Sequence, residues 1–413
     1  MTDLLTRSIE FSPLREAGLS RLEAFVPFAA SKYTNERNFD YGANNRSNVS
    51  ALSPWVRNRL ITEEEICARV MRDFAFSSTE KFIQEVFWRT YWKGWLELRP
   101  SVWHHFTSKR DNVVSNLKYS EYQAAINGTT GIDCFDAWAH ELVETGYLHN
   151  HARMWFASIW IFTLKLDWTV GADFFLRHLM DADAASNTLS WRWVAGLQTK
   201  GKNYIARASN ISTFTNGRFA PKGLNENAHP LPDDISFDKP MMPPMRTTLP
   251  SGKNAMLLIN EDDCAPEQLS FHSNKITNIA TWNLSAARSP LELGSVAAHF
   301  TSSALADAAT RASEKFNAPS TSFEGKQALD KIVNAATDAK VDCVIAPYTN
   351  QGWARGPMDQ LAAKLRSNNI GFYEIQRDWD TRAWPHASKG FFAFKEKIPQ
   401  LMRDAGFDLQ SKR

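Results

Sequence analysis

One stretch of the sequence places an acid, a base and two indoles on the same side of a helix. Glu85, Trp88, Arg89 and Trp92 are spaced by three, four and seven residues, and these spacings share one helical face. The resulting surface is too polar for a plain core stripe and too aromatic for a plain solvated one. It could bind a flat ligand; the alternative is a Glu85–Arg89 ion pair beside core tryptophans.

A second segment, residues 146–154, follows a glycine and leads into a strongly apolar helix. Asn150, Arg153 and Met154 stand at i, i+3 and i+4, and a helix start of this kind can hold polar groups at the mouth of a cavity. The alternative is an ordinary helix cap with a surface arginine.

A third segment combines carboxylates, an amide and two indoles. Asp181, Asp183 and Asn187 stand among small residues that allow a flat ligand to come close, and Trp191 and Trp193 follow. D-x-D offers too few oxygens for a hard-cation cage, so we expect no metal. A carboxylate here can pair with a guanidinium such as that of Arg153 and stay ionised beside an apolar pocket.

Helices must position these residues. Residues 58–74 carry Thr62 as an expected N-cap with Glu65 three residues later, a capping-box pattern. Helical periodicity continues through residues 80–98, 135–149 and 150–166. No set of short alternating strands precedes Pro221, so we expect an all-α domain over residues 1–220 with its site built between helices.

Residues 221–254 hold seven of the 18 prolines, and we interpret this stretch as a linker. The hydrophobic pattern of the sequence changes after it. Short apolar runs at 255–259, 276–283, 341–348 and 370–376 alternate with helical stretches such as 296–316 and 356–368. This alternation predicts a smaller α/β domain over residues 255–413, with a doubly wound parallel sheet. The common glycine-rich phosphate-binding fingerprints are absent from the sequence.

Composition excludes several classes of protein. The 47 Lys and Arg nearly balance the 45 Asp and Glu, so a nucleic-acid surface would have to be a local patch. Four widely spaced cysteines argue against a zinc site or a disulfide scaffold. Without a signal-like start or an apolar run of 18 residues, we expect a cytoplasmic monomer that does not cross a membrane.

The motifs together resemble the flavin domain of the cryptochrome/photolyase family. The family's pattern matches, in order, residues 50–54 (S-x-L-S-P), 85–89 (E-x-x-W-R), 146–154 (G-x-x-H-N-x-x-R-M) and 181–193 (D-x-D-x-x-x-N-x-x-x-W-x-W). The resemblance covers roughly residues 30–215. Four ordered motifs make an accidental match improbable.

The resemblance implies bound FAD. The loop at Ser50 would hold the diphosphate, the Arg153–Asp181 ion pair would lie over the flavin, and Asn187 would face flavin N5. The complete set of cofactor-binding residues that it implies is Ser50, Leu52, Ser53, Phe82, Arg89, Asn150, Arg153, Asp181, Asp183 and Asn187.

The same comparison implies a substrate. Members that split cyclobutane pyrimidine dimers resemble this chain at Glu85, which would bond a base carbonyl, and at Trp88 and Trp193, which would wall the flipped lesion. Asn150 and Met154 complete that set, since six-four photolyases have histidines there. His151 departs from the arginine usual in dimer-repair enzymes.

Further residues have roles implied by the family. Trp191 and Trp168 match the proximal and middle members of its electron-transfer chain, while the distal member has no match at the aligned spacing. We expect His151, Lys200 and Lys202 to contact DNA, the two lysines through phosphates from a glycine-containing loop; a solvated loop is the alternative.

The order of the domains differs from the family's, in which an α/β antenna domain comes first. Residues 379–395 resemble the segment that closes that domain, so we interpret residues 255–413 as a relocated antenna-like domain; an unrelated α/β module is the alternative. The sequence assigns no second chromophore.

The sequence therefore favours a deoxyribodipyrimidine photolyase-like lyase, which cleaves C–C bonds of dimers in damaged DNA under blue light. It does not distinguish single-stranded from double-stranded substrates. A cryptochrome-like sensor that photoreduces flavin without repair is the first alternative. A protein that kept the fold and lost the cofactor is the second.

Overall fold

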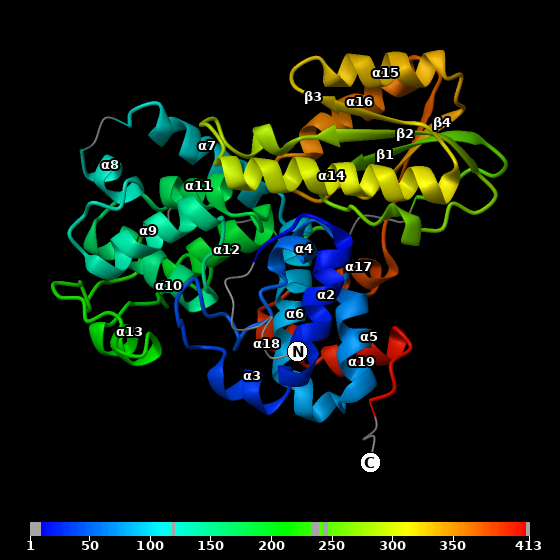
Figure 1. The fold of residues 1–413 in the computed structure, drawn as a ribbon. Helices are drawn as coiled ribbons and strands as arrows, with labels where there is room; N and C mark the ends of the chain where they lie inside the picture. The colour runs from blue at the N-terminus through cyan, green and yellow to red at the C-terminus, as the bar shows by residue number, and fades with distance from the viewer. Residues whose placement is uncertain (1–9, 118–119, 233–238, 243–246, 410–413) are drawn as a thin grey trace.

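The structure is a computed structural model that describes residues 10–117, 120–232, 239–242 and 247–409. It combines a helical region with a five-stranded parallel sheet (Figure 1). Within the described residues no helix is long and apolar enough to span a membrane.

The chain before Pro221 is helical, and its described part contains no strand. Thr62 caps α5 as predicted: its Oγ1 accepts from the Glu65 N–H, and the Glu65 carboxylate accepts from the Thr62 N–H. A π-helical turn, Ile159–Thr163, follows α10. The α-helices of this region are α2 (Arg15–Phe25), α3 (Ser31–Glu36), α4 (Ser53–Arg57), α5 (Glu63–Asp73), α6 (Phe76–Glu97), α7 (Ser101–Val114), α8 (Ser120–Ile126), α9 (Asp133–Thr145), α10 (Asn150–Ser158), α11 (Trp168–His178), α12 (Ala184–Val194) and α13 (Ala208–Phe214).

The described residues of the predicted linker before Asn254 form no helix or strand. The parallel sheet that follows has the order β3-β2-β1-β4-β5. At its centre, Leu257 of β1 pairs with Ile279 of β2 and with Ile345 of β4. Its strands are β1 (Asn254–Asn260), β2 (Lys275–Asn283), β3 (Ser320–Glu324), β4 (Cys343–Pro347) and β5 (Gly371–Ile375).

Helices cover both faces of this sheet (Figure 1). One face packs against α15 (Ala328–Asp338) and α16 (Arg355–Ser367), and the other packs against α14 (Ser295–Phe316). Helix α14 also contacts α9 and α11, so it joins the sheet to the helical region.

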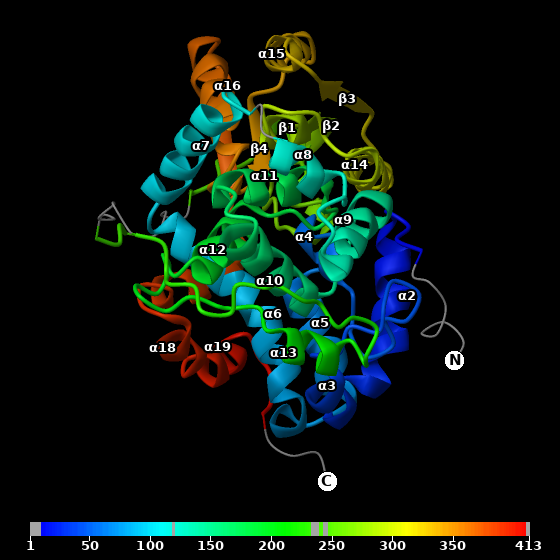
Figure 2. The same cartoon turned by 90° about the vertical axis from the view of Figure 1, so that its left-hand side faces the viewer.

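After β5 the chain returns to the helical region. Helices α17 (Asp378–Ala383), α18 (Phe391–Lys395) and α19 (Ile398–Asp404) follow, and α17 and α18 pack against α6 (Figures 1 and 2). Trp384 is fully buried against Gly94, where an added Cβ would lie 2.6 Å from the indole Cδ1. The predicted α/β domain thus ends in a segment that packs on the helical region.

A buried ion network fixes this return. Arg59 Nη2 contacts Asp380 Oδ1 at 2.7 Å, Nε contacts Glu63 Oε2 at 3.3 Å and Nη1 lies 3.6 Å from Asp263 Oδ2. These carboxylates come from α17, α5 and the loop after β1, so one guanidinium ties three parts of the chain together. Buried charges of this kind persist only when they are paired.

Candidate flavin and lesion site

An ion pair predicted from the sequence lies at the start of α10. Arg153 Nη1 donates to Asp181 Oδ1 at 3.0 Å and Nη2 donates to Oδ2 at 2.8 Å, while Nε donates to the Leu148 carbonyl at 3.0 Å. Burial disfavours the guanidinium charge, but Asp181 outweighs it and raises the pKa of Arg153. The two-pronged contact holds a permanent cation in a defined orientation.

Asp183 and Asn187 are set by the first turn of α12. Asp183 Oδ1 caps the helix by accepting from the Ser186 N–H at 2.8 Å, and its Oδ2 lies 3.4 Å from both Arg89 Nη1 and Lys93 Nζ. Burial opposes ionisation, yet these cations hold the pKa of Asp183 well below its ordinary value. Asn187 Nδ2 donates to the Ala172 carbonyl at 2.8 Å, which leaves Oδ1 for another contact.

Lys93 was missed by the sequence analysis. It is buried on α6, four residues after Arg89, and this spacing was the signal that could have revealed it. Arg89 pairs with Asp183 and with Glu63 at 3.2 Å, not with Glu85. The predicted alternative of a Glu85–Arg89 pair is therefore wrong, because Arg89 turns toward the buried carboxylates.

An ion pair joins the charged residues around Asp183 to the sheet. Arg57 Nη1 contacts Asp262 Oδ1 at 3.1 Å, just beyond the carboxyl end of β1. The cavity between Arg57, Lys93, Asp183, Asp262 and Asn350 measures only about 10 Å³, room for about one water. This end of the sheet, where ligands of such folds usually bind, has no space for a second chromophore at that place.

Glu85 lies on α6 and keeps access to solvent. Its side chain is 39% exposed, yet burial raises its pKa against the effect of Arg37, whose Nε is 3.8 Å from Oε1. Arg37, 26% exposed, and Arg153, 23% exposed, also keep access to solvent. Asn150 is exposed and Met154 is half-buried at the start of the same α10 helix.

Each expected wall indole is backed by a second aromatic ring. Trp88 stacks on Phe391 of α18 with centroids 3.4 Å apart and planes 11° apart, and Trp193 stacks on Tyr204 at 5.6 Å and 27°. Both indoles remain half-buried, so each keeps surface for a further contact. Phe391 was not among the predicted site residues.

Arg21 fixes the backbone of the predicted diphosphate loop through hydrogen bonds to its carbonyls. Its Nε donates to the Ser50 carbonyl at 2.8 Å and its Nη2 to the Val49 carbonyl at 2.9 Å. Ala51 adopts a φ of 51°, which costs energy outside glycine, and α4 begins two residues later. Ser53 is exposed and Leu52 is buried.

Phe82 packs in a buried aromatic cluster, edge-on to Tyr33 at 5.2 Å and 4.9 Å from Phe25. Its predicted contact with the cofactor stays a prediction. Two ring nitrogens of His151 contact the Asn38 carbonyl at 2.9 Å and Tyr204 Oη at 3.2 Å. Burial lowers the pKa of His151, which disfavours a cation there, whereas Lys200 and Lys202 are exposed in the following loop.

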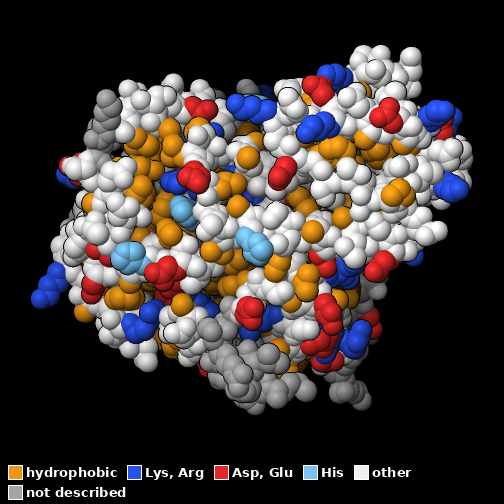
Figure 3. Space-filling model, turned by 45° about the horizontal axis from the view of Figure 1, so that its top comes forward, with side chains coloured by type: hydrophobic (Ala, Val, Ile, Leu, Met, Phe, Trp, Pro, Cys, Tyr) orange, Lys and Arg blue, Asp and Glu red, His pale blue; other side chains and the backbone are white. Residues whose placement is uncertain are grey.

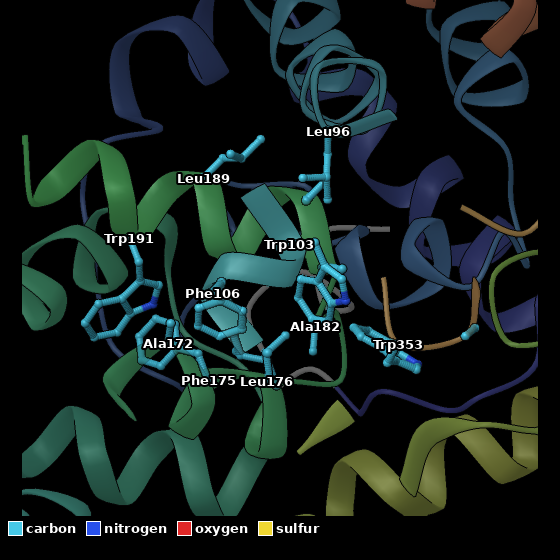
Figure 4. Close-up of a cluster of buried hydrophobic side chains, with 14 of the residues drawn as sticks. Leu96, Trp103, Phe106, Ala172, Phe175, Leu176, Ala182, Leu189, Trp191 and Trp353 are labelled. Carbon is cyan, nitrogen blue, oxygen red and sulfur yellow. The ribbon is translucent and has the colours of Figure 1, made fainter. Parts of the chain in front are cut away.

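The two predicted electron-transfer residues, Trp191 and Trp168, are buried, and Figure 4 shows Trp191 beside Phe175. Trp191 lies 5.2 Å from Phe175 and 6.2 Å from Trp160, both edge-on. Trp168 packs 5.6 Å from Phe106, which leads through Trp103 to Trp353 of the α/β part. Their electron-transfer role stays a prediction.

Comparison with known proteins identifies the helical region. A family model described as the FAD binding domain of DNA photolyase matches residues 82–223. Residues 82–223 of this chain are thus similar to the flavin-binding domain found in DNA photolyases. The matched segment runs from Phe82 through α12, so it contains three of the four motifs found in the sequence.

Curated relatives are similar to part of this chain. The chain is 32% identical to the mitochondrial deoxyribodipyrimidine photo-lyase of Saccharomyces cerevisiae, covering 46% of this chain and 35% of the relative. It is 35% identical to the deoxyribodipyrimidine photo-lyase of Streptomyces griseus, covering 40% and 38%. A Synechocystis cryptochrome structure aligns with a TM-score of 0.42 at 24% identity, covering 51% and 45%. The chain thus spans less than half the length of each.

The residues present fit FAD. The Ser50–Ser53 loop at a helix start offers hydroxyl and backbone N–H donors suited to a diphosphate. The Arg153–Asp181 pair and the Asn187 amide offer donors and acceptors for the polar edge of a flavin ring.

Proposed function

We propose that this protein repairs cyclobutane pyrimidine dimers in DNA under blue light with FAD as its cofactor. The observation that carries the proposal is the Arg153–Asp181 ion pair, which forms at the start of α10 as the resemblance implies. Glu85, Asn150, Met154 and the indole of Trp88, which the resemblance assigns to the lesion, all keep surface accessible to a ligand. The relatives named deoxyribodipyrimidine photo-lyase support the same activity.

Bound, reduced FAD would supply the electron after light absorption. The remaining roles belong to this chain. Glu85, whose pKa burial raises, donates a hydrogen bond from its protonated carboxyl to a base carbonyl of the lesion. That bond stabilises negative charge that develops on the base.

Trp88 and Trp193 hold the extruded dimer by their faces. Base–aromatic stacking contributes about 1–3 kcal/mol per base, and a ring that is itself backed by Phe391 or Tyr204 moves little. Asn150, exposed at the start of α10, contributes an amide to the lesion contact. Lys200 and Lys202 bind phosphates of the same strand.

The surface over the top of the molecule is a poor alternative DNA site. Figure 3 shows Lys and Arg interspersed with Asp and Glu on that face. A mixed surface of this kind does not attract a polyanion strongly.

The test is repair of an oligonucleotide that carries one cyclobutane dimer, measured in light and in the dark on protein whose flavin absorbance is recorded. We expect repair in light only. Photoreduction of the flavin without repair would instead identify a sensor, and colourless protein would contradict flavin binding.

Two variants assign the pocket. Glu85→Ala should lower the repair yield at least tenfold while flavin absorbance persists. Asp183→Ala should lose the flavin, because it removes the carboxylate that lies 3.4 Å from both Lys93 and Arg89 beside the expected cofactor. Normal repair by Glu85→Ala would show that the pocket is wrongly assigned, and circular dichroism checks that both variants fold.

A further inference from the structure

Helix α18 has one buried aromatic face and one exposed one. Phe391 and Phe394, three residues apart, point into the protein and are 8% and 0% exposed. Phe392 is 85% exposed, and Lys395 stands three residues further along the same side. A bulky aromatic side chain left in water next to a lysine is a candidate ligand contact.

This exposed ring follows Phe391 in the sequence, and Phe391 belongs to a row of aromatic side chains on α18 and α6. Trp88 stacks on Phe391, and Trp92 lies 5.3 Å from Trp88, one helical turn further along α6. We call Trp88, Trp92, Phe391 and Phe392 the aromatic strip. It leads from the expected lesion wall to solvent.

Hydrogen bonds fix the segment that carries Phe391 and Phe392 against α6. Tyr91 Oη donates to the Lys389 carbonyl at 2.9 Å, Arg99 Nη2 donates to the Ser388 carbonyl at 2.7 Å, and Trp379 Nε1 donates to Thr90 Oγ1 at 2.9 Å. These three bonds attach the C-terminal segment to the second half of α6 and to the residue Arg99 beyond its end. The backbone that carries Phe392 is therefore fixed at Ser388 and Lys389.

A second exposed apolar side chain lies at the same end of α6. Met241 is 59% exposed, and its N–H donates to the Leu98 carbonyl at 2.9 Å, next to Arg99. Isolated exposed apolar residues need no explanation, and Met241 is bonded just beyond α6, whereas the strip residues Trp88 and Trp92 lie within it.

The charge around the strip suits a polyanion. The segment 389–397 contains Lys389, Lys395 and Lys397, with Glu396 as its one carboxylate, while Arg382 before it pairs with Asp378 at 3.4 Å. Aromatic platforms with cations between them are the means by which proteins bind single-stranded nucleic acid. A protein partner could pack on the apolar rings, but it would not carry a regular array of negative charges to pair with the lysines.

We propose that the aromatic strip binds bases of an unpaired DNA strand beside the lesion, with Phe392 stacking on a base and Lys389 and Lys395 contacting phosphates. The favoured substrate is then a dimer in single-stranded or locally opened DNA. This inference rests on the proposed function, because continuity with the Trp88 wall is what places DNA on the strip.

The test is binding in the dark, by fluorescence anisotropy, to a labelled 16-nucleotide oligothymidine that carries one dimer, alone and annealed to its complement. We expect wild-type protein to prefer the single strand. Phe392→Ala should weaken single-strand binding about 5- to 100-fold, the effect of losing one stacked base, and should change duplex binding less than twofold. Phe392→Trp should restore it.

Two further variants control the result. Val143→Ala removes another exposed apolar side chain, on α9, and should bind like wild type. Lys389→Ala should reduce the slope of log affinity against log salt by about 0.7 on the single strand, the value for one phosphate contact. Size-exclusion chromatography of each variant reports any change of assembly.

Several outcomes would overturn the inference: wild-type preference for the duplex, unchanged binding by Phe392→Ala, equal loss on both substrates, or loss of an assembled form in place of DNA binding. Because binding is measured without light, the two proposals fail separately. Phe392-dependent binding without photorepair refutes only the proposed function, and repair with unchanged Phe392→Ala binding refutes only the strip.

Discussion

Glu85 combines access to solvent with a pKa raised by burial. The protonated carboxyl is therefore populated at higher pH than for an ordinary glutamic acid, whose pKa is about 4.3. Arg37 lies close enough to limit this effect without reversing it. A carboxylic acid that keeps its proton can donate to a carbonyl, which is the role proposed for it.

This argument predicts the pH dependence of repair. If the protonated form donates to the lesion, the repair yield per absorbed photon should fall as pH rises through the raised pKa of Glu85. Glu85→Gln keeps an N–H donor at every pH, so its profile should be flat over the same range. Yields are measured from pH 5 to 9 at saturating DNA. A wild-type profile as flat as that of the variant would remove Glu85 from the role of donor.

At the scale of elements, helices α11 and α12 meet through a glycine. A Cβ on Gly171 would lie 2.5 Å from Trp191 Cη2 and 2.8 Å from Trp160 Cε2. The absence of a side chain is what lets α12 bring Trp191 against α11. The position of Asn187, one turn earlier on α12, depends on the same packing.

Gly171→Ala should therefore lower the free energy of unfolding by about 1–3 kcal/mol through overpacking and shift the tryptophan fluorescence of the folded protein. Gly356→Ala in α16 is the matched control, because nothing lies within 4 Å of its added Cβ. It should be neutral or stabilise by up to about 1 kcal/mol. Urea denaturation measures both. Equal effects of the two variants would refute the contact argument.

The elements predicted best are those with a local signal. The capping box of Thr62 and Glu65 fixed the start of α5, and four apolar runs predicted β1, β2, β4 and β5. Strand β3 was missed because its sequence, Ser320–Glu324, is polar and largely exposed. Periodicity detects burial, and an edge strand with little burial provides none.

The site was predictable where one motif places two groups close together. The Arg153–Asp181 pair formed as expected from the family resemblance. The stacking of Phe391 on Trp88 joins residues about 300 positions apart, and no local pattern encodes such a contact. It depends on how α18 returns to α6 after the whole sheet has formed.

At the scale of the molecule, the helical region and the sheet meet at a buried carboxyl. Glu97, near the end of α6, accepts from the Gln351 N–H at 2.6 Å and from Tyr348 Oη at 3.0 Å, both in the loop after β4. Burial raises the pKa of Glu97 to about 7, although these hydrogen bonds oppose the shift. Near neutral pH this contact changes its charge.

Between the ordinary pKa of Glu97, 4.5, and its value of about 7 in the folded protein, the folded state binds a proton that the unfolded state has lost. The contribution of Glu97 to the free energy of unfolding is thus fully present below the lower pKa and is lost as pH rises to the higher one. At about 1.36 kcal/mol per pH unit, the loss is about 3 kcal/mol. Glu97→Gln should lack this component.

The measurement is the free energy of unfolding at pH 5, 6, 7 and 8 for wild type, Glu97→Gln and the exposed-site control Glu144→Gln. The difference between Glu97→Gln and wild type should grow in favour of the variant as pH rises, while the control follows wild type. A constant difference would show that Glu97 does not titrate in this range.

The return of α17 to α19 onto α6 also has a consequence during synthesis. A ribosome that has completed residues 1–250 has made every matched flavin-binding helix, but the ring that backs Trp88 and the indole that packs on Gly94 are still untranslated. The aromatic surface of the nascent helical region therefore stays uncovered until the sheet and the last helices have been translated. Such a surface attracts chaperones and neighbouring chains, so premature termination in the last helices would yield a product prone to aggregation.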